Sequence, residues 1–437
     1  MNWSIQRHSY GVALIFAGLP IVWILRALVN APNSQIYSIV AMILGLCLIV
    51  YPPKLWKCTL EVIFPPLTQS FWQLVPLLFL IPALVASFLA NIPDDLGGVY
   101  ILFLIAFLIA FNTVPYERLK FLPQACFVIS ATGCLVVLLY ALKSGIGLSG
   151  QRLTAAATNS PGQIAYMGGT ALISGIATLN HLSKSLSSLL RNYAYAAIML
   201  GTAVVILAVS RSTLIGLSLC LLFALFNRIY YFAPEKLPPI HLKIKPKKSW
   251  FSSTELKLII WAVILIFAIL YWENLLLTLS PVAKTFNTYQ ERFWTYLQKG
   301  YQTYAEGTGT ELSAGKRRAL LTYAISNFDN LGHGYKSLWV DCPLAQAFYD
   351  GGLLGGLLFL AVALIIPVAC IANLTYFQPV DPIKSICIYL YIFSSPTLVL
   401  HGQPYDFYFW LRIVIIYSVM SKINSFRFRK TSRVQID

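Results

Sequence analysis

The sequence predicts an all-α, polytopic membrane protein with about twelve transmembrane helices and one large loop that contains short helices. Two observations support this fold class. Hydrophobic residues make up 58% of the 437 residues and charged residues only 11%, whereas soluble domains carry about 25% charged residues. In addition, apolar runs of roughly 18 or more residues, the length that crosses a bilayer as a helix, recur along the chain.

Each predicted span is an apolar run bounded by polar or turn-forming residues. In chain order the predicted spans are residues 10–28, 35–51, 68–90, 98–113, 121–142, 162–180, 193–210, 212–232, 257–277, 351–374, 383–400 and 407–424. Two connections are long: a basic, Pro-containing linker at 233–256 and a polar loop at 278–350. They divide the chain into nine spans within 1–277, the large loop, and three spans with a basic tail within 351–437.

The net charge of +16 is read as a signal of membrane topology. Lys and Arg gather on alternate connections and in the C-terminal tail, as they do on the cytoplasmic side of membrane proteins. The large loop shows no such excess, since it holds seven Lys or Arg and six Asp or Glu. We therefore expect both termini inside, the large loop outside, a lipid bilayer as partner, and no nucleic acid.

The eight cysteines do not predict a disulfide framework. Most of them fall within predicted spans, and Cys342 is the one cysteine of the large loop. A cysteine with no second cysteine on the same side of the membrane is not expected to form a disulfide within the chain.

Arg211 interrupts about forty otherwise apolar residues at Ser210-Arg211-Ser212. An ionisable side chain inside an apolar stretch is a candidate functional residue. The alternative is an arginine at a turn that extends its charged end to the membrane boundary.

The large loop carries the sequence Lys316-Arg317-Arg318 near the start of a predicted helix over 314–328. Arginine presents a planar, permanently charged fork that suits phosphate oxygens, and helix N-termini favour anions. The alternative is a solvated surface cluster.

Asp341 stands shortly before the next apolar block. A carboxylate there can act as a general base, orient an acceptor hydroxyl, or simply pair with an arginine. Asp350 precedes Gly351-Gly352 and is predicted to cap the following helix.

His333 lies between two glycines, for which a structural role in the loop is the alternative to a contact with substrate. No second His or Cys stands at metal-ligand spacing, so no metal and no other cofactor is expected. His401 lies on a short outer connection and is expected to line a cavity together with these loop residues. Arg412 is a further charge inside the last predicted span.

These motifs, in this order, resemble the O-antigen polymerase and O-antigen ligase superfamily of bacterial envelope glycosyltransferases. Val209-Ser210-Arg211-Ser212 resembles the family's Ser-Arg turn that leads into a span. Gly315-Lys316-Arg317, a helix, and then Leu331-Gly332-His333-Gly334 resemble its arginine, helix and Gly-x-Gly element. The stretch from Asp341 to Gly355 resembles the block that closes the large loop. Gly150 to Gln163 is a weaker match.

The chain departs from the ligases at Asp341. In ligases the closing block opens with His-Asn at this position, whereas here Asp341 is followed by Cys342. An Asp at this place is more similar to the polymerase members.

The resemblance implies a GT-C-like, metal-independent glycosyltransferase of the bacterial inner membrane, with the large loop in the periplasm. Its substrate would be a glycan on undecaprenyl pyrophosphate, transferred to a lipid-linked repeat unit in lipopolysaccharide biosynthesis, and a chain-length regulator is a possible partner. The implied catalytic residues are Arg211 and Arg317 on the pyrophosphate and Asp341 on the acceptor hydroxyl. The implied substrate contacts are Arg152, Arg318, His333, Lys336, His401 and Arg412.

Three other functions stay open from the sequence. A ligase would transfer the finished glycan to lipid A-core. A transporter or flippase of lipid-linked oligosaccharide would show repeat symmetry and charges buried in mid-span. A purely structural assembly subunit would leave Arg211 unexplained.

Overall fold

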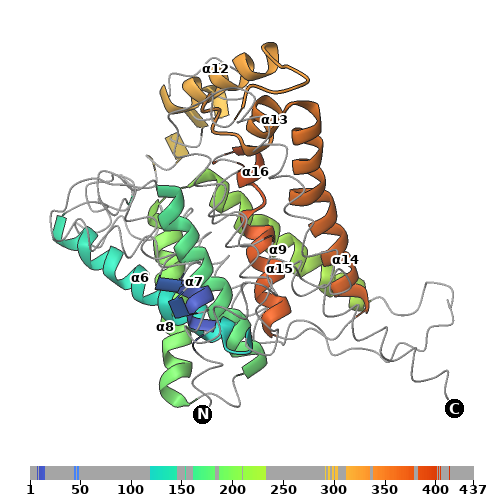
Figure 1. Cartoon of the computed structure of the whole chain (residues 1–437). Coiled ribbons are helices and arrows are strands. Elements are labelled where there is room, and N and C mark those ends of the chain that lie inside the picture. The colour runs from blue at the N-terminus through green and yellow to red at the C-terminus, as the bar shows by residue number, and fades with distance from the viewer. Residues whose placement is uncertain are drawn as a thin grey trace, which may run out of the picture.

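The computed structural model describes residues 119–144, 153, 161–182, 187–208, 210–232, 312–334, 338–377 and 382–400, with short pieces within 7–14, 44–48, 291–303 and 402–413. Over these residues the regular elements are helices, and no strand occurs among them (Figure 1). The α-helices are α6 (Leu122–Ser144), α7 (Pro161–Leu182), α8 (Ser188–Ala208), α9 (Arg211–Phe232), α12 (Leu312–Ser326), α13 (Pro343–Leu360), α14 (Ile366–Phe377), α15 (Pro382–Ser394) and α16 (Thr397–Leu400). A π-helical segment, η5 (Ala361–Ile365), joins α13 to α14.

Four helical segments are long and apolar enough to cross a membrane: Leu122–Ala141, Ser188–Ala208, Pro343–Ala372 and Pro382–Leu400. The prediction of an all-helical chain with membrane-spanning helices is therefore confirmed for the described residues. The predicted number of about twelve spans is not confirmed. Six of the predicted spans lie wholly or mostly outside the described residues: 10–28, 35–51, 68–90, 98–113, 257–277 and 407–424.

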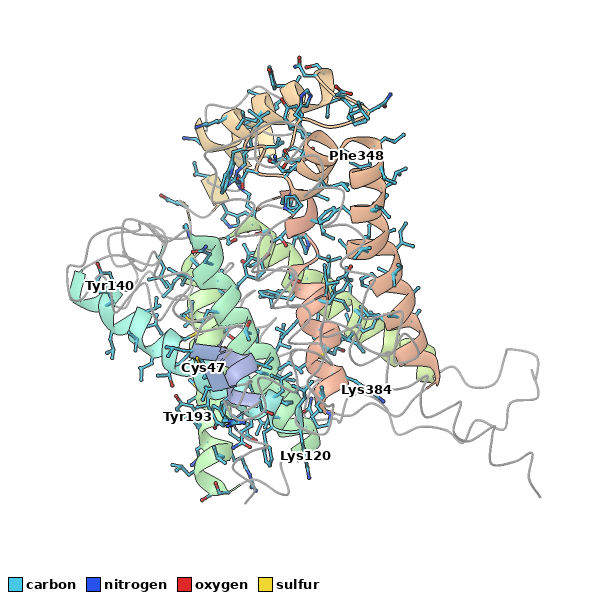
Figure 2. The ribbon with its side chains drawn as sticks, in the orientation of Figure 1. Cys47, Lys120, Tyr140, Tyr193, Phe348 and Lys384 are labelled. Carbon is cyan, nitrogen blue, oxygen red and sulfur yellow. The ribbon has the colours of Figure 1, made fainter. Side chains whose placement is uncertain are left out.

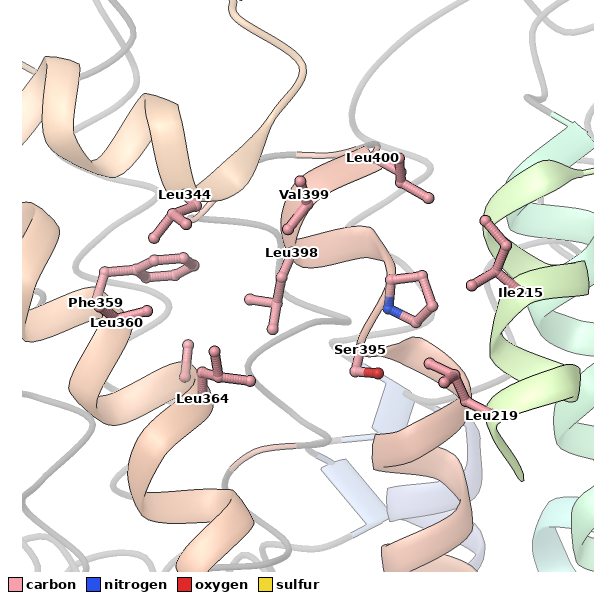
Figure 3. Close-up of a pocket in the computed structure, with 12 residues that line it drawn as sticks. Ile215, Leu219, Leu344, Phe359, Leu360, Leu364, Ser395, Leu398, Val399 and Leu400 are labelled. Atoms are coloured by element: carbon pink, nitrogen blue, oxygen red, sulfur yellow. The ribbon is translucent and has the colours of Figure 1, made fainter. Parts of the chain in front are cut away.

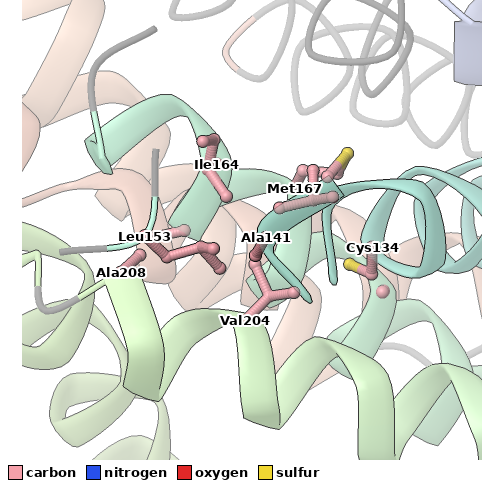
Figure 4. Packing of buried hydrophobic residues seen from close by; sticks show 10 residues of the cluster. Cys134, Ala141, Leu153, Ile164, Met167, Val204 and Ala208 are labelled. Atoms are coloured by element: carbon pink, nitrogen blue, oxygen red, sulfur yellow. The ribbon is translucent and has the colours of Figure 1, made fainter. Parts of the chain in front are cut away.

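Helices α7 and α8 approach each other closely because glycines face each other across their contact. A Cβ atom added to Gly168 of α7 would lie 2.8 Å from the carbonyl oxygen of Gly201 on α8. Small residues let helix backbones come together in lipid, where no hydrophobic effect drives helices to associate. Next to this contact, buried side chains of α6, α7 and α8, among them Cys134, Ile164 and Val204, form one cluster (Figure 4).

Helix α15 packs against α7 and α9 through Phe393, a side chain that is 1% exposed. The Phe393 ring fills the space left by Gly169 of α7, and its backbone lies against Gly216 of α9. The ring also meets the Tyr166 ring edge-on, with centroids 5.3 Å apart. One aromatic residue thus joins three helices.

Helix α12 and the first part of α13 lie together at one end of the molecule (Figure 1). Helix α13 bends at Gly352, whose φ of 64° is not helical. Figure 2 labels Phe348 at this end and Lys120 and Lys384 at the opposite end.

The predicted helix start at 351 is wrong, because α13 begins at Pro343 with Cys342 as its N-cap. Asp350 lies inside α13, two residues before the bend at Gly352, and its Oδ1 accepts a hydrogen bond from the Gln346 Nε2. Gln346 and Asp350 lower the hydropathy of the first residues of α13. The apolar pattern therefore starts later than the helix itself.

We expect Gly201→Ala to destabilise the protein. The added methyl group would overlap the Gly168 carbonyl oxygen and lie 2.9 Å from the Leu172 nitrogen. Overpacking of this kind costs about 1–3 kcal/mol, more than the gain of about 1 kcal/mol from replacing a helical glycine by alanine. The midpoint of thermal unfolding in detergent should fall.

The matched control is Gly351→Ala, because a Cβ atom at that position meets nothing within 4 Å. Equal midpoints for Gly201→Ala and Gly351→Ala would contradict the close approach of α7 and α8.

Candidate functional site

Arg317 on α12 and Asp341, two residues before α13, form an ion pair. The Arg317 Nε lies 2.5 Å from the Asp341 Oδ2, and the two side chains are 31% and 13% exposed. Helical residues spaced three and four apart share one face, and Leu321 and Ala324 follow Arg317 at this spacing. Both pack in a cluster with Val340. The face of α12 that begins at Arg317 is therefore the one that contacts the segment of Asp341.

The helical register also decides between the neighbouring basic residues. Successive residues of an α-helix point about 100° apart, so Lys316 and Arg318 lie on other faces than Arg317. Lys316 is exposed. The predicted alternative, a carboxylate that pairs with an arginine, is confirmed for Asp341.

The backbone of Asp341 is held in an unusual conformation. Its φ is 56°, and among the described residues no other non-glycine residue has a positive φ. The left-handed region is tolerated by Asp better than by most residues, yet it still costs about 1 kcal/mol or more. The Gly402 N–H donates a hydrogen bond of 3.1 Å to the Asp341 Oδ1. One carboxylate oxygen thus meets a backbone N–H, and the other meets Arg317.

Two glycine-containing segments pack directly on each other beside this pair. Gly332 has a φ of 82°, and a Cβ atom on Gly352 would lie 2.8 Å from the Gly332 nitrogen. The backbone N–H groups of His333 and Gly334 donate to the Tyr349 and Asp350 carbonyl oxygens at 2.9 and 3.0 Å. These glycines therefore attach the end of α12 to the bend of α13.

His333 belongs to this attachment. Its ring stacks on the Tyr349 ring with centroids 4.3 Å apart, and its Nε2 lies 2.8 Å from the Asn327 carbonyl oxygen. These contacts are those of a residue that orders the loop, which was the alternative to a contact with substrate.

Arg211 is the first residue of α9. The first turn of α9 is ordered by hydrogen bonds to Ser210, whose carbonyl oxygen accepts from the Thr213 Oγ1 at 2.8 Å and from the Leu214 N–H at 3.0 Å. The Arg211 Nε is buried. A cation at a helix N-terminus is unfavourable with respect to the helix dipole by roughly 0.3–1 kcal/mol, so helix stability does not explain an arginine here.

An apolar pocket of about 310 Å³ lies between α9, α13 and α16. Its lining side chains come from both sides of the space (Figure 3), among them Ile215, Leu344, Phe359 and Leu398. Ile215 follows Arg211 by one helical turn, and Leu344 follows Asp341 at a similar spacing. The pocket is therefore lined by residues that follow Arg211 and Asp341 closely in the sequence.

Gln346 is a residue of this site that the sequence analysis missed. It is fully buried, and its amide bonds to the backbone just before Asp341. A possible signal was its place four residues before Asp350, because residues at this spacing share a helix face.

The other predicted residues of the site, Arg152, Lys336, His401 and Arg412, lie outside the described residues. In the part of the chain that the structure describes, no three His, Cys, Asp or Glu side chains lie together as ligands for a metal ion.

The Cys342 thiol reports on the environment of Asp341. Burial raises the pKa of this thiol, and the charge of Asp341 raises it further. The backbone N–H groups of Ala345 and Leu344 oppose this shift in pKa. Cys342 is 5% exposed.

We expect Cys342 to react slowly with iodoacetamide. A raised pKa leaves less thiolate at any pH below it, and the thiolate is the nucleophile. The alkylation rate, followed by mass spectrometry, should therefore rise at a higher pH than it does for a free peptide thiol. A pH profile that coincides with the free thiol would contradict the burial of Cys342.

Comparison of the chain with protein-family models, with curated proteins and with solved structures finds no match in any of the three. The proposed function therefore rests on the resemblance of the sequence motifs and on the geometry of their residues.

Proposed function

We propose that the chain is an O-antigen polymerase or a polymerase of a related surface polysaccharide. It transfers a glycan from undecaprenyl pyrophosphate to a lipid-linked repeat unit at the periplasmic face of the bacterial inner membrane. The observation that carries this proposal is the ion pair between Arg317 and Asp341. The two residues come from separate motifs, and each had a predicted role in the same reaction.

The reaction divides the roles among these residues. The acceptor hydroxyl attacks the anomeric carbon of the donor sugar, and the bond from that carbon to the phosphate oxygen breaks. Asp341 takes the proton of the hydroxyl as a general base. Arg317 and Arg211 stabilise the negative charge that develops on the lipid pyrophosphate, which leaves.

The ion pair is compatible with both roles of its members. A guanidinium carries five N–H donors in a planar fork, so Arg317 can hold Asp341 through Nε and approach a phosphate oxygen through its terminal nitrogens. The pair would keep the base and the leaving group close to one another. A carboxylate fixed on two sides also spends no energy on reorganisation when the acceptor arrives.

The apolar pocket supports a lipid-linked substrate. It is lined by hydrocarbon side chains except at Ser395, and pockets of about 300 Å³ are large enough for part of a small ligand. We infer that it receives isoprene units next to the pyrophosphate. The headgroup would then lie beside the pocket, toward Arg211 at the start of α9 and Asp341 before α13.

The distribution of charge supports the proposed topology. Lys120 and Lys384 lie at the end of the molecule opposite to α12 (Figure 2). Basic residues mark the cytoplasmic side, which agrees with cytoplasmic termini and a periplasmic large loop.

The direct test is a reaction of the purified protein with lipid-linked repeat units, with and without a lipid A-core acceptor. We expect a ladder of longer glycans from the lipid-linked units alone, visible by gel electrophoresis. Transfer to lipid A-core without a ladder would instead identify a ligase. Movement of the lipid-linked glycan across vesicles without any new glycosidic bond would identify a flippase.

We expect Arg317→Ala to lower kcat for polymer formation by about 10²–10³-fold, the loss seen when one group that stabilises a developing anion is removed. Arg211→Ala should act in the same direction. The matched control is Lys316→Ala, which removes an exposed positive charge from the neighbouring position and should leave kcat within about twofold. Unchanged polymer length in Arg317→Ala cells that contain normal amounts of the inserted protein would refute the assignment.

A further inference from the structure

Gln346 uses its whole amide group in the buried start of α13. Its Oε1 accepts a hydrogen bond of 2.7 Å from the Val340 N–H. Its Nε2 donates to the Leu338 carbonyl oxygen at 2.5 Å and to the Asp350 Oδ1 at 2.7 Å. A buried amide that meets three partners is a specific arrangement, because each unsatisfied polar group would cost about 1–3 kcal/mol.

The bonds to Leu338 and Val340 order the chain just before Asp341. The Gln346 amide accepts from the Val340 N–H and donates to the Leu338 carbonyl oxygen, two backbone groups that lie two residues apart. The direction in which the chain enters Asp341 is therefore fixed by the side chain of Gln346.

Asp350 fixes the orientation of the amide. Its side chain is fully buried, and its Oδ1 accepts from the Gln346 Nε2. With the Nε2 on the side of Asp350, the Oε1 is left to face the Val340 N–H. Rotation of the amide by half a turn would place the Oε1 against two acceptors, the Leu338 carbonyl oxygen and the Asp350 Oδ1, and the Nε2 against the Val340 N–H.

We propose that Gln346 and Asp350 are positioning residues for Asp341. Three contacts then hold this residue: the amide of Gln346 on the preceding backbone, Gly402 on one carboxylate oxygen and Arg317 on the other. The strained φ of Asp341 persists because the segment before it is fixed. The consequence for catalysis rests on the proposed function, whereas the effect on the backbone does not.

The first test measures the backbone without any reaction. In Gln346→Leu, hydrogen exchange of the Val340 amide, followed by mass spectrometry on the purified protein, should be at least about tenfold faster, since the amide loses its acceptor. Alkylation of Cys342 should also accelerate. Ser326→Ala is the control, because it removes an exposed side-chain hydrogen bond of α12 and should change neither rate. Unchanged exchange and alkylation in Gln346→Leu would overturn the proposal.

The second test is a cycle with Asp341→Ala. Alone, Gln346→Leu should lower kcat by about 10–100-fold, the effect of a displacement of about 1 Å, with little change in KM for the lipid-linked donor. In the Asp341→Ala background it should lower kcat no further, because Gln346 acts through Asp341. Losses of kcat that multiply would identify a general structural role and overturn the proposal.

Because Gln346→Leu can fail to fold, a second pair of variants exchanges the hydrogen-bonding groups of Gln346 and Asp350. Gln346→Glu cannot donate to Asp350 and should lower kcat. Adding Asp350→Asn restores a donor and an acceptor between the two positions, so the double variant should recover part of the lost kcat. If kcat does not recover in a double variant with wild-type thermal stability, the proposal for Gln346 and Asp350 is overturned. If Asp341→Ala is fully active, the proposed function fails, and the hydrogen-exchange result still decides the role of Gln346.

Discussion

The contact between the backbones at Gly332 and Gly352 is the constraint on which the candidate site depends. A side chain at either position would overlap the opposite backbone, so the loop after α12 can reach the bend of α13 only through glycine. Arg317 lies near Asp341 at the other end of the same two segments. The segment at 338–340 precedes Asp341 and is the one that Gln346 binds.

The free energies of the interactions around Asp341 indicate that its ion pair with Arg317 adds little to the stability of the fold. The Arg317 side chain is 31% exposed, and a partly exposed ion pair contributes about 0–1 kcal/mol. The left-handed backbone of Asp341 costs about as much or more. The start of α9 has the same imbalance, because Arg211 stands at the unfavourable end of a helix dipole. Two arrangements that gain so little for the fold are more readily explained by what the side chains bind.

The sequence predicts the helices of the described region because hydropathy reports burial in lipid one residue at a time. It misses the start of α13, since Gln346 and Asp350 read as polar although both are buried and satisfied by hydrogen bonds. The glycine motifs are found by resemblance alone, because their role depends on a contact between positions 20 residues apart. The pairing of Arg317 with Asp341 stands among the alternatives for the same reason: spacing along the chain does not say which of several arginines lies near a carboxylate.

The apolar lining of the pocket supports the proposed chemistry at the membrane face over transport. A carrier of a charged headgroup needs polar groups along its path, because a charge in hydrocarbon is costly. The pocket between α9, α13 and α16 offers only hydrocarbon side chains and Ser395, so it cannot solvate a pyrophosphate. It can hold a hydrocarbon chain. A lipid-linked substrate would therefore be bound by its chain from within the membrane while its headgroup stays at the level of the ion pair. Such a site fixes the bond to be broken at one depth, which a transferase requires and a transporter must avoid.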